Sequence, residues 1–208
     1  MKALEKEKLI SLGVKYYDLI INGSNRGAYM FQGGISKEIL KLNNKIKGPI
    51  IGFNKDLFLD EMLNSRKLNE QGATGSLNGI EDNFWRAKIE PVQFSNENIG
   101  TNQEIYLKKS INLLESFRNG VKKTSEVFDI NKLAKIMALR ALLGSSEFDY
   151  RDIKFYFNPE TSLLEVITKE SHVDLNHNFK DHYFSWWIDS SFIKPHRPSN
   201  KKFFLDLL

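Results

Sequence analysis

The stretch LRALLGSSEFDYRDIKFYFNPETSLLEVITKE, residues 139–170, carries the pattern that decides the expected fold. It joins the end of an apolar helix to a glycine, an acidic loop and two strand-like runs. The turn-forming residues 158–162 (NPETS) separate the apolar runs 153–157 and 163–168, which predicts a β-hairpin. Gly144 supplies the left-handed turn that commonly ends a helix.

The helix that leads into this stretch is expected over residues 130–143. Asp129 is placed to cap it, with Phe128 and Leu133 as a hydrophobic staple. Its residues are apolar on nearly all sides, which predicts a helix at the centre of the core.

The upstream segments mix strands and helices. Residues 14–21 and 28–31 are expected to form a hairpin around the turn 22–27, because Asn and Gly tolerate positive φ. Helices are expected over 37–45, 57–63 and 106–117, a short strand over 50–53, and a strand near Pro91 at a sheet edge. Residues 64–83 are polar enough to predict a flexible loop. The expected fold class is therefore α+β, with residues 1–208 as one domain.

The composition narrows the function classes. Of 208 residues, 41% are hydrophobic and 12% aromatic, enough for one sizeable core. The 30 basic and 26 acidic residues leave a net charge of only +4, which argues against a dedicated nucleic-acid binder. The chain has no cysteine, and no run approaches the about 20 apolar residues of a membrane span. We expect a soluble protein, compatible with the cytoplasm.

Acidic side chains gather around the hairpin. Glu147, Asp149 and Asp152 lie within six residues of one another, and the hairpin is expected to return Glu170 to the same end of the sheet. Clustered carboxylates repel one another unless a cation or proton joins them, so the group indicates a hard metal ion. The spacing of Glu147 and Asp152 is also that of a kinase catalytic loop. The alternative interpretation is a solvated acidic turn.

Two stretches resemble the CotH-like, spore-coat-type family of atypical protein kinases. The first is residues 21–32 (INGSNRGAYMFQ), followed by residues 36–40 (SKEIL) and 48–50 (GPI). The second comprises the pairs at 128–129, 138–139 and 143–144, residues 154–159 (KFYFNP) and Leu164-Glu165. The resemblance implies a protein-kinase-like fold that uses ATP and Mg²⁺ or Mn²⁺ to phosphorylate Ser or Thr hydroxyls of a protein substrate.

The resemblance also implies roles for single residues. Glu147 falls at the position of the catalytic acid, and Asp152 and Glu170 fall at the two metal-binding positions; all three differ in type from the family's residues. Gly33 stands where the family usually has Glu. The family's preceding segment, which carries the nucleotide-binding Lys, has no counterpart in residues 1–12, so we expect a partial domain. Two alternatives remain open: a catalytically inactive pseudokinase that binds protein, and a module that binds anionic polymers.

Overall fold

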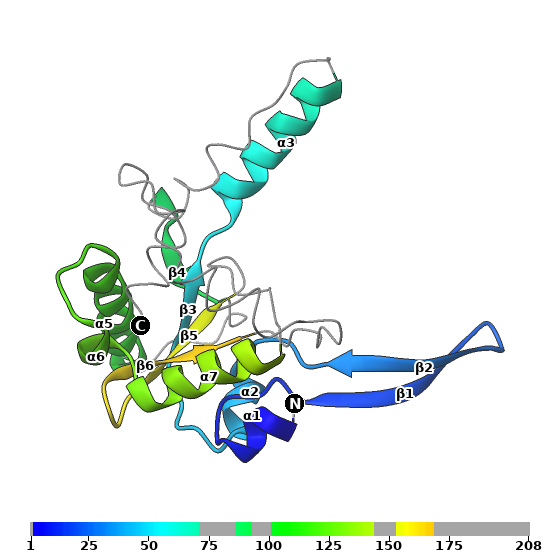
Figure 1. Ribbon diagram of the computed structural model, residues 1–208, viewed down its shortest axis with the longest axis horizontal. Coiled ribbons are helices and arrows are strands. Elements are labelled where there is room, and N and C mark those ends of the chain that lie inside the picture. The colour runs from blue at the N-terminus through cyan, green and yellow to red at the C-terminus, as the bar shows by residue number, and fades with distance from the viewer. Residues whose placement is uncertain (1, 71–85, 93–100, 144–152, 169–208) are drawn as a thin grey trace.

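The computed structural model describes residues 2–70, 86–92, 101–143 and 153–168, and these form an α+β structure, as expected (Figure 1). Two antiparallel sheets are present in the described part of the chain. One has four strands and two packed faces, and the other is a two-stranded ribbon. No helix among the described residues has both the length and the apolar character to cross a bilayer.

The four-stranded sheet has the order β4-β3-β5-β6, built from β3 (Ile50–Phe53), β4 (Ile89–Pro91), β5 (Lys154–Asn158) and β6 (Leu163–Ile167). All three pairings are antiparallel. The predicted hairpin is confirmed as β5 and β6, with Lys154 opposite Ile167 and Asn158 opposite Leu163. Pro91 lies in the edge strand β4, where its missing N–H leaves no gap in a central ladder.

One face of this sheet packs against α5 (Thr101–Arg118), α6 (Thr124–Val127) and α7 (Ile130–Leu143). Aromatic rings dominate the contact. The Phe128 ring meets Phe117 edge-on at a centroid distance of 5.0 Å and Phe155 at 5.8 Å. All three side chains are buried, and a fully buried Phe contributes about 1.5–3 kcal/mol of hydrophobic stabilisation. This layer is the main core.

The opposite face is covered by α2 (Lys37–Leu42) and by residues 9–12, which follow α1 (Lys2–Lys6). Ile39 and Leu40 pack on Ile50 and Tyr156 of the sheet. α2 ends three residues earlier than expected, because Asn43 bonds back to the Ile39 carbonyl oxygen and Asn44 adopts φ +52°. The sheet is therefore covered on both faces, in an α/β/α arrangement.

The two-stranded ribbon consists of β1 (Val14–Ile21) and β2 (Ser24–Gln32) and extends away from the rest of the described structure (Figure 1). The predicted hairpin is confirmed, but β2 begins at Ser24 rather than at residue 28. Asn22 and Gly23, at φ +51° and +76°, make the turn by themselves. A bulge then places Arg26 and Gly27 opposite the single residue Leu19.

Two further expectations are corrected. α3 (Asp56–Glu70) runs past residue 63, so residues 64–70 are helical and not loop; residues 71–83 lie outside the described residues. The polar residues 64–70 include Arg, Lys, Leu and Glu, which suit an exposed helix. α7 is not central: Leu133 and Ile136 are buried, but Ile130 is 41% and Leu142 is 66% exposed. It packs one face beside β6 and leaves the other exposed.

Candidate functional site

The three residues that the sequence assigns to catalysis and metal binding, Glu147, Asp152 and Glu170, lie outside the described residues. The structure instead fixes the points from which their segments depart. α7 ends at Leu143, the chain is described again from Ile153, and the description ends at Thr168 after β6. The assignments of these three residues therefore stay predictions, while the geometry of their anchors is defined.

The anchors converge at one end of the sheet. Lys154 pairs with Ile167, so Ile153 and Thr168, one residue further out on each strand, lie at the same end of the hairpin. Both are buried, at 2% and 8% exposure. The loop that carries Glu147 and Asp152 thus joins the sheet beside the point where the segment carrying Glu170 leaves it.

A row of four residues crosses the sheet at this end: Glu90 of β4, Gly52 of β3, Lys154 of β5 and Ile167 of β6. Directly opposed residues in neighbouring strands share a face. The Lys154 side chain lies flat over Gly52, because a Cβ on Gly52 would come within 2.9 Å of the Lys154 Nζ atom. Glu90 accepts a hydrogen bond of 3.0 Å from the Asn54 amide. This end of the sheet is therefore polar.

Sequence reasoning missed Lys154 as a member of this end of the sheet. The signal that pointed to it is Gly52, since a glycine inside a strand often marks the close approach of another group. An ammonium group beside a cluster of carboxylates suits the recognition of an anion such as phosphate. The pairing of Gly52 with Lys154, about 100 residues apart in the chain, follows from the tertiary fold and not from local pattern.

One strand pair further along the same face lies a buried carboxylate, Glu165, which is 2% exposed. It accepts hydrogen bonds from three side chains. Lys45 bonds Oε2 at 2.7 Å, while Lys132 at 2.7 Å and Asn158 at 2.9 Å bond Oε1. We call these residues the Glu165 network. It ties β6 to α7, to β5 and to the segment after α2.

The network perturbs the ionisation of its neighbours. Burial alone would lower the pKa of the Lys132 ammonium, but hydrogen bonds from Glu165 and Asp129 raise it. Burial would likewise raise the pKa of Asp129, and its bonds with the Lys132 side chain and backbone N–H lower it instead. Asp129 is the predicted N-cap of α7, and the bond of 3.2 Å from the Lys132 N–H confirms that role.

The donors around Glu165 favour a structural role over a catalytic one. Both carboxylate oxygens are occupied by side chains of the protein, and two of these carry the opposite charge. Nearby, the Tyr156 hydroxyl donates to the Ile46 carbonyl oxygen at 2.8 Å, and burial with the charge of Glu165 raises its pKa above the usual range. Within the described ranges, no group of three or more His, Asp or Glu side chains is arranged to hold a metal ion.

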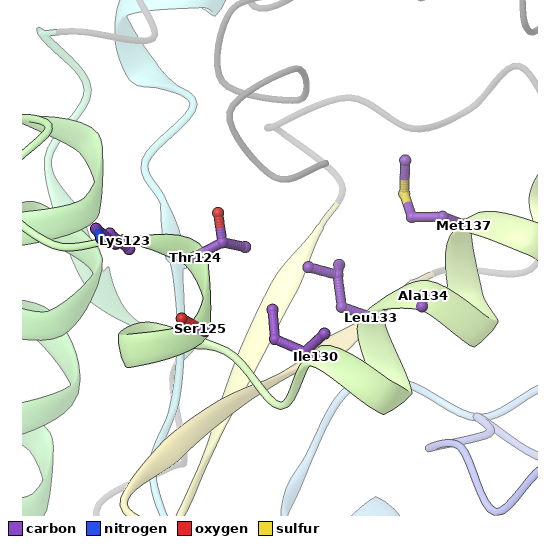
Figure 2. A pocket seen from close by; sticks show the side chains of 7 residues that line it. All are labelled: Lys123, Thr124, Ser125, Ile130, Leu133, Ala134 and Met137. Carbon is purple, nitrogen blue, oxygen red and sulfur yellow. The ribbon is translucent and has the colours of Figure 1, made fainter.

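A shallow cavity of about 360 Å³ lies between α6 and the first half of α7 (Figure 2). Its wall on α7 is apolar, formed by Ile130, Leu133, Ala134 and Met137, and residues 123–125 form a more polar rim. Figure 2 shows the Met137 side chain at one end of the cavity and Thr124 at the other. It has the size of a small-molecule or peptide side-chain pocket but brings together no catalytic group.

Comparison with known proteins gives no independent assignment: neither the models of protein families nor the curated protein sequences match this chain. The functional argument therefore rests on the residues themselves. Of the candidate locations, the end of the sheet with converging anchors is the one that joins the sequence-predicted carboxylates to a described structural feature.

Proposed function

We propose that this chain is a kinase-like domain of the CotH-like type, which uses ATP and Mg²⁺ or Mn²⁺ to phosphorylate Ser or Thr hydroxyls of a protein. One observation carries the proposal. The antiparallel register of β5 and β6 holds Ile153 and Thr168 at the same end of the sheet, where the two carboxylate-bearing segments are attached. The hairpin thereby supplies the common scaffold that such a site needs.

The donor set fits the chemistry. Carboxylate oxygens are the ligands that Mg²⁺ and Mn²⁺ prefer, so Asp152 and Glu170 would hold the metal ion. Glu147 would accept the proton of the substrate hydroxyl. Bound ATP and metal supply the phosphoryl group and neutralise its charge. Lys154, which the sequence reasoning did not include, adds a cation at the same end of the sheet.

The first test is nucleotide binding. Any ligand that binds the native state must stabilise it, by about 2.7 kcal/mol when its concentration is 100 times its dissociation constant. We expect ATP with MgCl₂ or MnCl₂ to raise the thermal unfolding midpoint, and ATP with EDTA to raise it less. An unchanged midpoint over millimolar nucleotide would refute nucleotide binding and, with it, phosphoryl transfer.

The second test is the role of Glu147. Glu147→Gln keeps the shape of the side chain and removes its charge, so transfer of labelled γ-phosphate to a protein substrate should fall at least about 100-fold. Glu160→Gln is the matched control, because Glu160 is exposed in the turn at the opposite end of the same hairpin. If Glu147→Gln retains full transfer, the assignment of the catalytic acid is wrong.

An inactive protein-binding module is the second candidate, and Gly33 is the observation that favours it. A Cβ on Gly33 would collide with the Leu12 carbonyl oxygen, so this backbone position admits no side chain without a shift. Related kinases are expected to carry Glu there. This candidate predicts protein binding that ATP does not change, and it falls if the chain transfers phosphate.

A further inference from the structure

The β1–β2 ribbon exposes an unusual amount of apolar surface. Residues 14–31 include no buried side chain, and seven large apolar ones are 45–72% exposed. These are Tyr16, Tyr17, Ile20, Ile21, Tyr29, Met30 and Phe31. An isolated two-stranded hairpin is at best marginally stable in water, because it has no layer to pack against. The described residues supply no such layer, so an additional one is needed.

The two faces of the ribbon are not equivalent. The pairs Lys15–Phe31, Tyr17–Tyr29 and Ile21–Ser24 share one face with Leu19, since directly opposed residues point the same way. We call Tyr17, Leu19, Ile21, Tyr29 and Phe31 the aromatic face. The rings of Tyr17 and Phe31 already contact each other on it, edge-on at 6.4 Å. The other face carries Tyr16, Ile20 and Met30, but Asp18 interrupts it.

The area of the aromatic face matches the requirement of a dimer. Its four exposed members are 45–63% exposed, which at about 200 Å² for each large side chain corresponds to about 400 Å² of apolar surface. Protein interfaces are about 60% apolar, so this amount corresponds to about 700 Å² in total on each copy. A standard stable interface buries about 800 Å² on each partner.

The charges on the ribbon also suit a second copy of the same surface. Lys15 lies at the base of the aromatic face, and Ile21 lies near the tip. In a two-fold, face-to-face arrangement with antiparallel ribbons, the base of one copy lies over the tip of the other. The two lysines then lie at opposite ends of the interface, and no like charges meet at its centre.

We propose that two copies of this chain associate by packing the aromatic faces of their β1–β2 ribbons against each other. The interface is a sheet-on-sheet contact about 10 Å thick, centred on Tyr17 and Tyr29. It lies on the ribbon and not at the end of the four-stranded sheet, so it does not depend on phosphoryl transfer.

The chain offers a closely matched pair of variants for the test. Tyr17→Lys introduces a charge at the centre of the aromatic face, while Tyr16→Lys introduces the same charge one residue away, on the opposite face. Both positions lie outside the core, and thermal unfolding by circular dichroism will show whether either variant changes folding. We expect sedimentation equilibrium of the unmodified chain to show a monomer–dimer equilibrium between about 1 and about 100 µM.

Tyr17→Lys should raise the dissociation constant at least about tenfold, as loss of a central aromatic contact does, and Tyr16→Lys should change it less than about threefold. A chain that stays monomeric at the highest concentration overturns the proposal and leaves another polypeptide as the occupant of the ribbon. Equal effects of the two variants overturn the assignment to the aromatic face.

Cross-linking gives a second readout that does not need a weakened interface. Because the chain has no cysteine, Leu19→Cys and Ile20→Cys each introduce one thiol, on opposite faces of β1. A short bismaleimide should join Leu19→Cys chains into dimers much more efficiently than Ile20→Cys chains. The reverse preference, or none, contradicts the proposed packing.

Discussion

Replacement of Glu165 by Gln is expected to destabilise the fold strongly, although the two side chains have almost the same shape. The carboxylate is 2% exposed and accepts hydrogen bonds from two ammonium groups and one amide. The Gln amide has one acceptor oxygen instead of two and places an NH₂ group toward a lysine. The variant therefore leaves positive charge without its partner inside the structure.

The magnitude follows from the exposure of the two lysines. Removal of one partner from a fully buried ion pair costs about 3–5 kcal/mol. Here the Lys45 and Lys132 side chains are 15% and 25% exposed, so each regains part of its hydration, and Lys132 keeps the Asp129 carboxylate at 2.9 Å. We therefore expect a loss of about 3 kcal/mol, at the lower end of this range. For a chain of 208 residues, this loss corresponds to a decrease of about 6–12 °C in the unfolding midpoint.

Urea unfolding followed by circular dichroism at 222 nm measures this loss directly. Glu160→Gln is the control, since Glu160 is exposed in the turn of the same hairpin and should change the free energy of unfolding by less than about 0.5 kcal/mol. A double-mutant cycle with Lys45→Met isolates one ion pair and should give a coupling energy above about 1 kcal/mol. A loss below about 1 kcal/mol for Glu165→Gln, with an unchanged urea slope, would show that the carboxylate is not held as the structure indicates.

Two further predictions concern the same layer. Gly48→Ala should lower the free energy of unfolding by about 1–3 kcal/mol, because the new Cβ would overlap the Phe157 carbonyl oxygen, whereas Gly34→Ala meets nothing within 4 Å and should be nearly neutral; equal urea midpoints for the two variants would contradict this. The pKa of Lys132 is raised in the fold, so its contribution should be complete below the ordinary lysine pKa of about 10.4 and lost as the pH rises above it. The pKa of Asp129 is lowered, so its contribution should be present above about pH 3.9 and lost as the pH falls further. Urea unfolding across both pH ranges should show each loss, and Lys132→Met should flatten both; slopes that this variant leaves unchanged would exclude the pair as their source.

Local signals in the sequence predicted most of the described elements. Asn22-Gly23 and residues 158–162 gave the two hairpins, and Asp129 gave the start of α7. These signals succeed because a tight turn or a helix cap depends on a few adjacent residues. The end of α3 was wrong for a related reason: polarity indicates that a segment is exposed, but it does not separate an exposed helix from a loop.

Tertiary relations were less predictable. The apolar residues of α7 indicated burial on all sides, yet the structure buries Leu133 and Ile136 and leaves Ile130 and Leu142 exposed. Apolar residues on both faces of β1 and β2 would likewise indicate a buried ribbon, and the structure shows an exposed one. In both elements, composition reports how much apolar surface the chain has and not what covers it.

The Glu165 network was not predicted, although a glutamate within the run LLEVI is an evident departure from an apolar strand. Its partner Lys45 lies 120 residues away in sequence, so only the folded structure reveals the pair. The candidate carboxylates Glu147, Asp152 and Glu170 lie outside the described residues, and their assignment continues to rest on spacing and resemblance.

The position of Glu165 links stability to the candidate site through strand register. Its neighbours in β6, Leu164 and Val166, point into the main core, while Glu165 points to the opposite face. A slip of β6 by one residue would place the carboxylate among the aromatic rings and remove it from both lysines. Such a slip is excluded by the cost of an unpaired buried charge. The same register sets Ile167 opposite Lys154, and hence where the segment toward Glu170 begins. A buried ion pair that adds little net stability over apolar packing can therefore still define the geometry on which the proposed phosphoryl transfer depends.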